Sequence, residues 1–267
     1  MNLWWTLTER PHFSPTELFQ KWDVVIVGGG FTGLWTAHHL ISSNPRLKIA
    51  VLEKDRVGSG ASGRNGGWIS ALYPVTKERT ELLDAHLIQS IDEIGDFVSQ
   101  AKIDCGFIKG GSLSIARNYG QLRRLQKESH DVLLSSKETR ERVNFEGALG
   151  ATFTPHCARI NPAQLVVGLA QSLASRGVQI FENTPAEISF NKTVTVNGNL
   201  VNADFVVRAI EAYHSQSRDQ IPIYSLIVAT DPLRLPLSMK LESRISKHSP
   251  KLHTSLLMPK ELRIIDC

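Results

Sequence analysis

The sequence is poor in cysteine, in long apolar runs and in concentrated charge, and each shortage excludes a class of protein. Three cysteines occur among 267 residues, at Cys105, Cys157 and Cys267, and none forms a CxxC pair. Neither a disulfide framework nor a structural metal site is expected, and the pattern fits a reducing compartment. No apolar run reaches about 18 residues, so no membrane-spanning helix is predicted.

The N-terminus and the charge pattern exclude further classes. The opening segment, MNLWWTLTERPHF, lacks a basic start followed by a long apolar core, so no signal peptide is predicted and the cytoplasm is expected. The formal net charge is +4 and scattered. The densest basic clusters, Arg123-Arg124 and Lys137 to Arg142, alternate with Glu and Ser on helix-like stretches. A solvated helix face is favoured there over nucleic-acid binding.

Hydrophobic residues make up 42% of the chain and charged residues 21%, which favours a packed core. Residues 1–21 read as a polar arm that Trp4 and Trp5 pack onto the domain. After it, Asp23 to Val27 predicts a buried strand, Phe31 to Ser43 a helix, and Leu47 to Glu53 a second buried strand. Strand, glycine turn, helix and strand form a βαβ unit, which predicts an α/β fold with a parallel sheet.

Further elements are predicted from hydrophobic period and turn residues. The helices are expected at 77–101, 118–135 and 162–176. The strands are expected as two short ones within 107–116, an extended stretch over 150–160, and strands at 178–182, 186–190, 193–196 and 205–208. Asn197-Gly198-Asn199 is typical of a hairpin turn. No element is predicted after about Leu233, where Ser, Lys, Pro and Leu alternate without a sustained period.

A glycine pattern joins the first strand to the first helix. Gly28, Gly30 and Gly33 form G-x-G-x-x-G. The first glycine permits a tight turn, the second lets a pyrophosphate approach the backbone, and the third lets the helix pack closely on the strand. The helix N-terminus offers N–H groups and a positive dipole end to phosphates. The pattern predicts a dinucleotide site because it follows a strand and opens a helix.

Two more features indicate which kind of dinucleotide cofactor is bound. Glu53 follows Gly33 by 20 residues, at the end of the second strand, where an acidic residue is expected to bind ribose hydroxyls. The loop GSGASGRNGGW, Gly58 to Trp68, comes next and suits a bulky flat cofactor rather than a direct continuation into another βαβ unit. A glycine-rich turn in another α/β fold and a flexible surface loop are the alternatives, and an NAD(P)-dependent dehydrogenase is a weaker one.

Several ordered segments resemble the FAD-dependent amine and amino-acid oxidases of the D-amino-acid oxidase superfamily, which includes glycine oxidase, sarcosine oxidase and gamma-glutamylputrescine oxidase. The resemblance covers about residues 20 to 232. It rests on DVVIVGGGFTGLWTAHHL, VLEKDRVGSGASGRNGGW, ARINPAQLVVGLAQSLASRGVQIFENTPA and VNADFVVRAIEAY. The segment GASGRNGG is most similar to the gamma-glutamylputrescine oxidase branch.

The resemblance implies a set of FAD contacts. They are Gly28, Gly30, Phe31, Thr32 and Gly33 at the pyrophosphate, Glu53 and Lys54 at the ribose, Ala61, Ser62, Arg64, Asn65, Gly66 and Gly67 beside the flavin, and Ala186 at the adenine. It also implies a discontinuous FAD-binding domain at 22–104 and 155–217. A partial α+β substrate domain is implied at 105–154 and 218–232, followed by an atypical tail at 233–267.

The implied reaction oxidises the C–N bond of an amine or amino acid to an imine by hydride transfer to FAD, with oxygen or another acceptor reoxidising the flavin. No Ser/His/Asp order, metal spacing or trusted pair of carboxylates occurs, so no catalytic side chain and no metal ligand is assigned. The histidines, including His38 and His39, are expected to serve packing or the surface. Which amine is oxidised is left open.

Family members continue beyond this length with a glycine-rich segment that closes over the flavin, and no such segment is found here. The resemblance fades between Ser225 and Leu233. We therefore expect a C-terminally truncated or frameshifted reading frame, which sequencing the locus would test. A non-catalytic remnant that keeps the dinucleotide-binding half is the alternative to an active enzyme.

Overall fold

The chain divides into two compact units, and each is described by itself. The first comprises Met1–Asn65, Val98–Cys105 and Asn161–Leu226, and the second comprises Gly66–Phe97, Gly106–Ile160 and Ile227–Cys267. The computed structural model describes residues 2–13, 18–71, 80–128, 131–143, 145–189, 193–213, 255–257 and 263–265. The expected division into a cofactor domain and a substrate domain stays a prediction.

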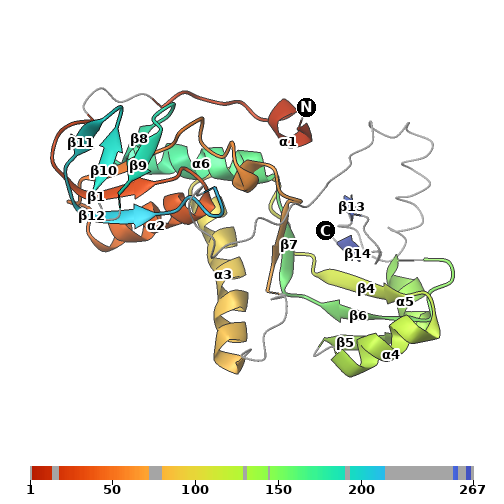
Figure 1. The fold of residues 1–267 in the computed structure, drawn as a ribbon. Helices are drawn as coiled ribbons and strands as arrows, with labels where there is room; N and C mark the ends of the chain where they lie inside the picture. Colours follow the sequence, from red (N-terminus) through yellow and green to blue (C-terminus); the bar gives the residue numbers. More distant parts are fainter. Residues whose placement is uncertain are drawn as a thin grey trace. The chain divides into compact units, whose positions relative to one another are not determined.

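A parallel sheet forms the centre of the first unit (Figure 1). Its strands lie in the order β12 (Ala203–Arg208), β1 (Trp22–Val27), β2 (Ile49–Leu52) and β8 (Gln179–Phe181). Each neighbouring pair is parallel. All four residues of β2 are buried, as the continuous apolar run predicts for a strand covered on both faces. The parallel α/β fold is confirmed.

Two helices pack against each other and against this sheet. Helix α2 (Phe31–Ser43) begins and ends at the predicted residues. Helix α6 (Pro162–Ser175) begins after Asn161, whose side chain accepts hydrogen bonds from two backbone N–H groups of the first turn. Proline is tolerated at the first helical position, and Gly177, just past the end, has φ +91°. These local signals explain why the helix was predictable.

A small antiparallel sheet packs with the parallel sheet. Its order is β11 (Asn199–Val201), β10 (Val194–Val196) and β9 (Ala186–Ile188). Valines of β10 and β11 share a buried cluster with alternate residues of β1 and β2. Because side chains alternate across a strand, the opposite face of the parallel sheet is the one left for helices. The predicted hairpin turn is present, with positive φ at Asn197 (51°) and Gly198 (77°).

The second unit is built on antiparallel pairing. One sheet has the order β13 (Ser255–Leu257), β14 (Arg263–Ile265), β4 (Ser112–Ala116), β6 (Gly150–Thr154) and β5 (Val132–Ser135). A separate pair joins β3 (Trp68–Ser70) to β7 (Cys157–Arg159). The helices are α3 (Glu81–Gln100), which ends in the first unit, α4 (Tyr119–Glu128) and α5 (Ser136–Val143).

Long-range pairing overrides two of the local predictions. The helix predicted over 118–135 stops at Glu128, and residues Val132–Ser135 form β5 instead, paired with β6. Within 107–116 only Ser112–Ala116 is a strand, because Ile108 makes a single bridge to Arg159. In both places a partner distant in sequence decides the backbone conformation, and a local period cannot reveal that partner.

After about Leu233, where the sequence let no element be placed, the structure has two short strands. Strands β13 and β14 pair with each other, and β14 pairs with β4 through Arg263–Ser114 and Ile264–Leu113. Strands of three residues are too short to show a period. Among the residues that the structure describes, no helix has the length and apolar character needed to cross a membrane.

Candidate dinucleotide-binding site

The turn between β1 and α2 can be formed only by glycine at two of its positions. Gly28 has φ +116°, and a Cβ atom there would lie 2.3 Å from the carbonyl oxygen of Ala209. A Cβ atom at Gly33 would lie 2.0 Å from the carbonyl oxygen of Gly28. The start of α2 therefore lies directly against the end of β1, which is the close helix–strand approach that the glycine pattern predicts.

Glu53 brings its carboxylate to this turn. Its Oε2 accepts a hydrogen bond from the backbone N–H of Gly29 at 2.8 Å, and its Oε1 accepts one from Asp55 at 3.0 Å. The main chain of Glu53 donates to Phe181 and accepts from Thr184. The carboxylate thus lies at the carboxyl end of β2, and the edge formed by the carboxyl ends of parallel strands is where open α/β sheets bind ligands.

The second glycine-rich loop, Gly58–Asn65, lies against the glycine turn between β1 and α2. The hydroxyl of Ser62 accepts a hydrogen bond from the backbone N–H of Phe31 at 2.9 Å, at the N-terminus of α2. A Cβ atom at Gly30 would lie 2.8 Å from the same hydroxyl oxygen. The N–H of Gly58 donates to the carbonyl of Gly29 at 3.1 Å. Two loops that were predicted separately therefore form one backbone surface at the helix N-terminus.

Apart from Lys54 and Ala186, the remaining predicted residues fall into three groups. Ala61, Arg64 and Asn65 belong to the short 3₁₀ turn at Ala61–Gly63 and the residues after it, where the side chains of Arg64 and Asn65 donate to loop carbonyls. Thr32 is exposed in the first turn of α2. Gly66 and Gly67 belong to the second unit, where the carbonyl of Gly67 accepts a hydrogen bond from Ile160 at 2.8 Å.

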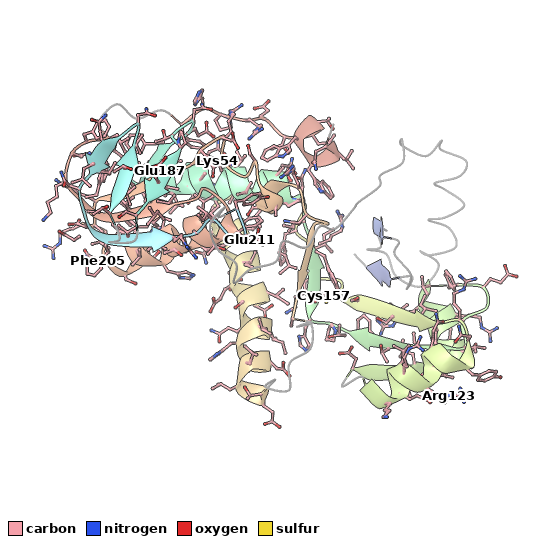
Figure 2. All side chains as sticks on the ribbon, in the orientation of Figure 1. Lys54, Arg123, Cys157, Glu187, Phe205 and Glu211 are labelled. Carbon is pink, nitrogen blue, oxygen red and sulfur yellow. The ribbon has the colours of Figure 1, made fainter. Side chains whose placement is uncertain are left out.

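Lys54 and Ala186 flank the end of β2. Lys54 follows Glu53, and its ammonium lies 5.4 Å from the centre of the Tyr213 ring and 3.9 Å from the Asp55 carboxylate (Figure 2). Ala186 opens β9, two residues after Thr184, which is bonded to Glu53. Both positions are therefore connected to the acidic residue through the chain.

Sequence reasoning missed most of the N-terminal arm. The predicted packing of Trp4 and Trp5 is confirmed: the Trp4 indole N–H donates to the carbonyl of Asn65 at 2.8 Å, and the Trp5 ring lies against Gly58 and Gly63. Arg10 stacks over the Trp5 ring at 3.9 Å and was not singled out. Burial, and then the Arg56 guanidinium, lower the pKa of Arg10, while Glu182 opposes them. No pattern in the sequence marks Arg10.

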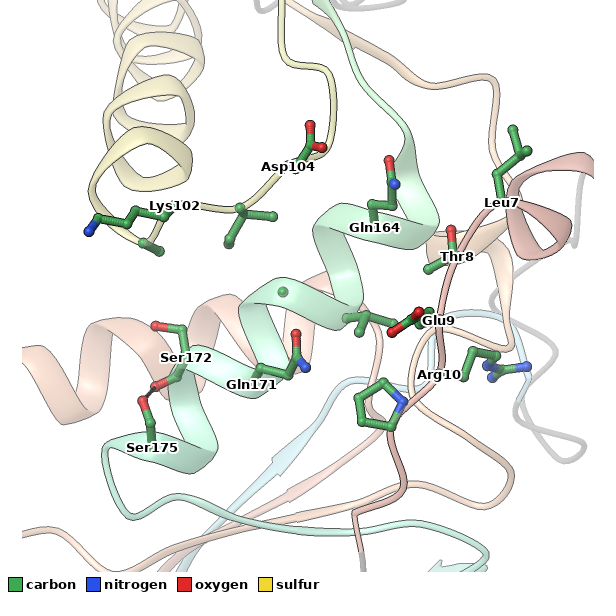
Figure 3. Close-up of a pocket in the computed structure, with 15 residues that line it drawn as sticks. Leu7, Thr8, Glu9, Arg10, Lys102, Asp104, Gln164, Gln171, Ser172 and Ser175 are labelled. Carbon is green, nitrogen blue, oxygen red and sulfur yellow. Dashed lines mark hydrogen bonds between the residues drawn. The ribbon is translucent and has the colours of Figure 1, made fainter.

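A groove of about 870 Å³ lies elsewhere on the first unit (Figure 3). Arm residues 7–11, residues 101–104 and one side of α6 line it, with Glu9, Lys102 and Asp104 among the charged side chains. None of the predicted cofactor contacts belongs to this lining. The candidate site therefore rests on the glycine turn and its hydrogen bonds, not on the groove.

His38 was expected to serve packing or the surface, and it lies on α2. His38 contacts Trp35, and its Nδ1 lies 3.3 Å from Arg176. Burial, followed by the charges of Arg176 and His39, lowers the pKa of His38. A packing role on the outside of α2 accounts for these contacts. In the described part of the chain, no group of three or more His, Cys, Asp or Glu side chains is placed to hold a metal ion.

Comparison with known proteins identifies the family. Residues 23–263 match the model of one family, the FAD dependent oxidoreductases known as DAO. The chain belongs to this family. The resemblance seen in the sequence is confirmed, and the match continues beyond Leu233, where that resemblance fades, to Arg263. The cofactor of the family is FAD.

Individual relatives match over much of this chain. A protein of Haemophilus influenzae named as a probable oxidoreductase, OrdL, is 27% identical over 252 residues, or 83% of this chain and 58% of that protein. Gamma-glutamylputrescine oxidoreductase of Escherichia coli is 27% identical over 82% of this chain and 57% of its own length. The chain therefore spans less than two thirds of the length of the curated relatives it matches.

The solved structures support the fold. Glycine oxidase from Geobacillus kaustophilus superposes with a TM-score of 0.63 at 24% sequence identity. The superposition covers 72% of this chain and 56% of that one. At this level of identity the likeness concerns the fold alone.

The described residues fit the adenine-dinucleotide part of FAD. A Cβ atom would meet backbone at Gly28 and the side chains of Glu53 and Ser62 at Gly29 and Gly30, so bare backbone suits this turn. Glu53 places an ionisable carboxylate at the turn, and a carboxylate there can accept hydrogen bonds from ribose hydroxyls. A phosphate group is favoured at the N-terminus of α2, because the backbone N–H groups of a first helical turn and the positive end of the helix dipole both attract negative charge.

Proposed function

We propose that this chain holds FAD at the turn between β1 and α2 and belongs to an oxidoreductase that oxidises a C–N bond. The observation that carries the cofactor part is the hydrogen bond between Glu53 and Gly29, 2.8 Å long, because it joins the acidic residue of the dinucleotide motif to its glycine turn. Family membership supports FAD over a nicotinamide cofactor.

Each predicted contact has a proposed part. The backbone from Gly28 to Gly33, with Phe31 and Thr32, holds the pyrophosphate. Glu53 and Lys54 hold the ribose, and the main chain of Ala186 contacts adenine. The residues beside the flavin are Ala61, Ser62, Arg64, Asn65, Gly66 and Gly67.

The proposed substrate is a small amine or amino acid, and the product is its imine. When bound, FAD supplies the hydride acceptor for the C–H bond beside nitrogen, and water hydrolyses the imine. The residues of this chain bind and orient the cofactor, and no side chain is assigned as acid or base. The names of two similar proteins, gamma-glutamylputrescine oxidoreductase and glycine oxidase, support the amine class. Oxygen or another acceptor takes the electrons.

The proposed functional division follows the sequence motifs. Residues 22–104 and 155–217 form the FAD-binding domain, and residues 105–154 with 218–232 belong to the substrate domain. The tail at 233–267 is atypical in sequence, and its strand β14 pairs with β4 of the proposed substrate domain. Limited proteolysis with and without FAD tests this division, because bound FAD should protect cleavage sites in the first domain and leave those at 105–154 unchanged.

The cytoplasm is the proposed location. The three scattered cysteines support it, because secreted domains of modest size commonly rely on disulfides. Cell fractionation with an antibody to the chain tests this proposal, and recovery in a secreted fraction would contradict it.

Flavin reduction by amines tests the reaction. The purified protein is loaded with FAD, freed of oxygen, and mixed separately with gamma-glutamylputrescine, glycine, sarcosine and a 2-hydroxy acid. Bleaching of the flavin absorbance by at least one amine and not by the hydroxy acid supports C–N oxidation. Bleaching by the hydroxy acid alone contradicts it, and a bound flavin that no amine reduces rejects the reaction and keeps the cofactor.

A further inference from the structure

A buried carboxylate directly after β8 fastens the N-terminal arm to the loop that follows β2. The Glu182 side chain is 1% exposed. Its Oε1 accepts a hydrogen bond from the N–H of Val57 at 2.7 Å, and its Oε2 accepts one from the N–H of Phe13 at 3.3 Å. The Nδ1 atom of His12 lies 3.0 Å from the same Oε2. A buried carboxylate is costly unless it is paired and hydrogen-bonded, and these contacts provide both.

Arg56 extends the attachment. Its Nε lies 3.5 Å from Oε2 of Glu182, within ion-pair range. Its Nη2 donates to the carbonyl of Arg10 and, at 2.8 Å, to that of Pro11. The arm from Arg10 to Phe13 is therefore held by Glu182 directly and through Arg56. We call Glu182, Arg56 and these arm residues the arm latch.

Beyond the arm latch, the arm presses on the second glycine-rich loop. A Cβ atom at Gly63 would lie 2.2 Å from the Trp5 ring, and one at Gly58 would lie 3.3 Å from it. Arg10 stacks over the same ring, 3.9 Å from its centre, and its Nη2 donates to the hydroxyl of Ser59 at 2.9 Å. A side chain at Gly63 would collide with the indole ring of Trp5, so the loop has glycine at this position.

This loop is the one that reaches the glycine turn. Ser62, between Gly58 and Asn65, accepts the hydrogen bond of the Phe31 N–H at the start of α2. Glu182 of the arm latch contacts the backbone N–H of Val57, just before this loop, and the Trp5 ring lies against the loop backbone at Gly63. The arm therefore contacts the same loop that reaches the proposed pyrophosphate site.

We propose that Glu182 and Trp5 are positioning residues that hold the loop Gly58–Asn65 against the start of α2 and thereby set the affinity for FAD. This rests on the proposed FAD site. Neither residue needs to touch the cofactor, because each acts through the loop backbone. Glu182→Gln keeps the shape of the side chain but turns one acceptor into a donor facing donor groups. The affinity then falls with the fraction of chains whose loop remains in place, and a lost charge-assisted hydrogen bond is enough to lower that fraction roughly tenfold or more.

The test uses the full chain and five variants, with FAD affinity measured by flavin fluorescence well below the melting temperature. Glu182→Gln and Trp5→Ala should each raise the Kd for FAD by about tenfold or more. Trp5→Phe, which keeps an aromatic ring over Gly63, should recover most of the affinity. Glu187→Gln is the charge-matched control, because Glu187 is exposed on β9 (Figure 2), and its Kd should equal that of the wild type.

A destabilised control separates positioning from general unfolding. Val194→Ala opens a cavity in a fully buried position of β10 and should lower stability without changing the Kd for FAD. Hydrogen exchange of the backbone amides of residues 57–65, without FAD, should accelerate in Glu182→Gln and not in Val194→Ala. These amides include Gly63, which donates to Gly58 at 3.0 Å.

Three outcomes are decisive. Raised Kd with accelerated loop exchange in Glu182→Gln supports the proposal. An unchanged Kd, or one that matches Val194→Ala at equal loss of stability, overturns it. If the wild type binds no FAD, the proposed cofactor fails, and the exchange data then decide separately whether Glu182 holds the loop.

Discussion

Gly33 and Gly28 lie so close that a Cβ atom on Gly33 would be 2.0 Å from the carbonyl oxygen of Gly28. The obstacle is backbone, which cannot rotate away as a side chain can. The contact sets the distance between α2 and β1 and hence the position of the helix N-terminus that we propose for the pyrophosphate.

Gly33→Ala should therefore shift α2 away from β1. Overpacking typically lowers the free energy of unfolding by about 1–3 kcal/mol. We expect a loss at the upper end of this range, because the new methyl group would meet backbone atoms that cannot rotate away. Urea unfolding checks the loss of stability, and FAD titration checks the accompanying loss of affinity. Gly60→Ala is the control, because a Cβ atom there meets Tyr213 at an ordinary 3.5 Å. Equal stability of the two variants would contradict the close packing.

Glu53→Gln should weaken the binding of FAD by about tenfold or more, because the carboxylate accepts hydrogen bonds from Gly29 and Asp55 and is proposed to accept those of the ribose. ADP, which carries the ribose without the flavin, should lose the same factor. Calorimetric titration of the two ligands measures both. A variant that loses FAD but binds ADP normally would place Glu53 away from the ribose.

Ser62→Ala removes the acceptor of the Phe31 N–H at the start of α2. An N-terminal helix N–H that loses its side-chain partner typically costs about 1 kcal/mol. Chemical unfolding should report a loss of this size. Ser62→Thr, which keeps a hydroxyl, should lose less, and equal losses in the two variants would exclude the hydrogen bond as the cause.

Cys157 should make stability depend on alkaline pH. Burial raises the pKa of its thiol, although hydrogen bonds with Ser70 and Trp68 act in the opposite direction. The unfolded chain then loses its thiol proton at a lower pH than the folded chain. The unfolding free energy should fall as the pH rises from the free-thiol pKa, about 8.5, toward the higher folded value.

Urea unfolding between about pH 7 and pH 10 measures this dependence. The alkaline fall should be smaller in Cys157→Ser, which has no thiol to ionise, than in the wild type. Parallel pH profiles in the two proteins would show that the Cys157 thiol ionises at the same pH in both states.

The sequence predicts those residues of the candidate site that belong to one short βαβ segment. Glycines at Gly28, Gly30 and Gly33 and the acid at Glu53 follow a spacing that the βαβ geometry imposes, so the residues that meet at the turn could be named in advance. The bounds of α2 followed from the same local pattern. Contacts that join distant segments could not be named this way.

The arm and the second unit illustrate the limit. The hydrogen bond between Phe13 and Glu182 joins positions 169 residues apart, and no period or spacing marks either partner. Glu182 alone reads as the end of a strand. Residues Val132–Ser135 continue a charged helix pattern and still form β5, because pairing with β6 outweighs local preference.

Flavin binding by the purified full chain tests the central claim most directly. The protein is incubated with FAD, passed through gel filtration and examined by absorbance, alongside Glu53→Ala and Gly30→Val, whose new side chain would press on the Ser62 hydroxyl. We predict that the wild type keeps a flavin band and that both variants lose most of it. A folded wild type that emerges colourless, or variants that keep as much flavin as the wild type, would contradict the proposed site.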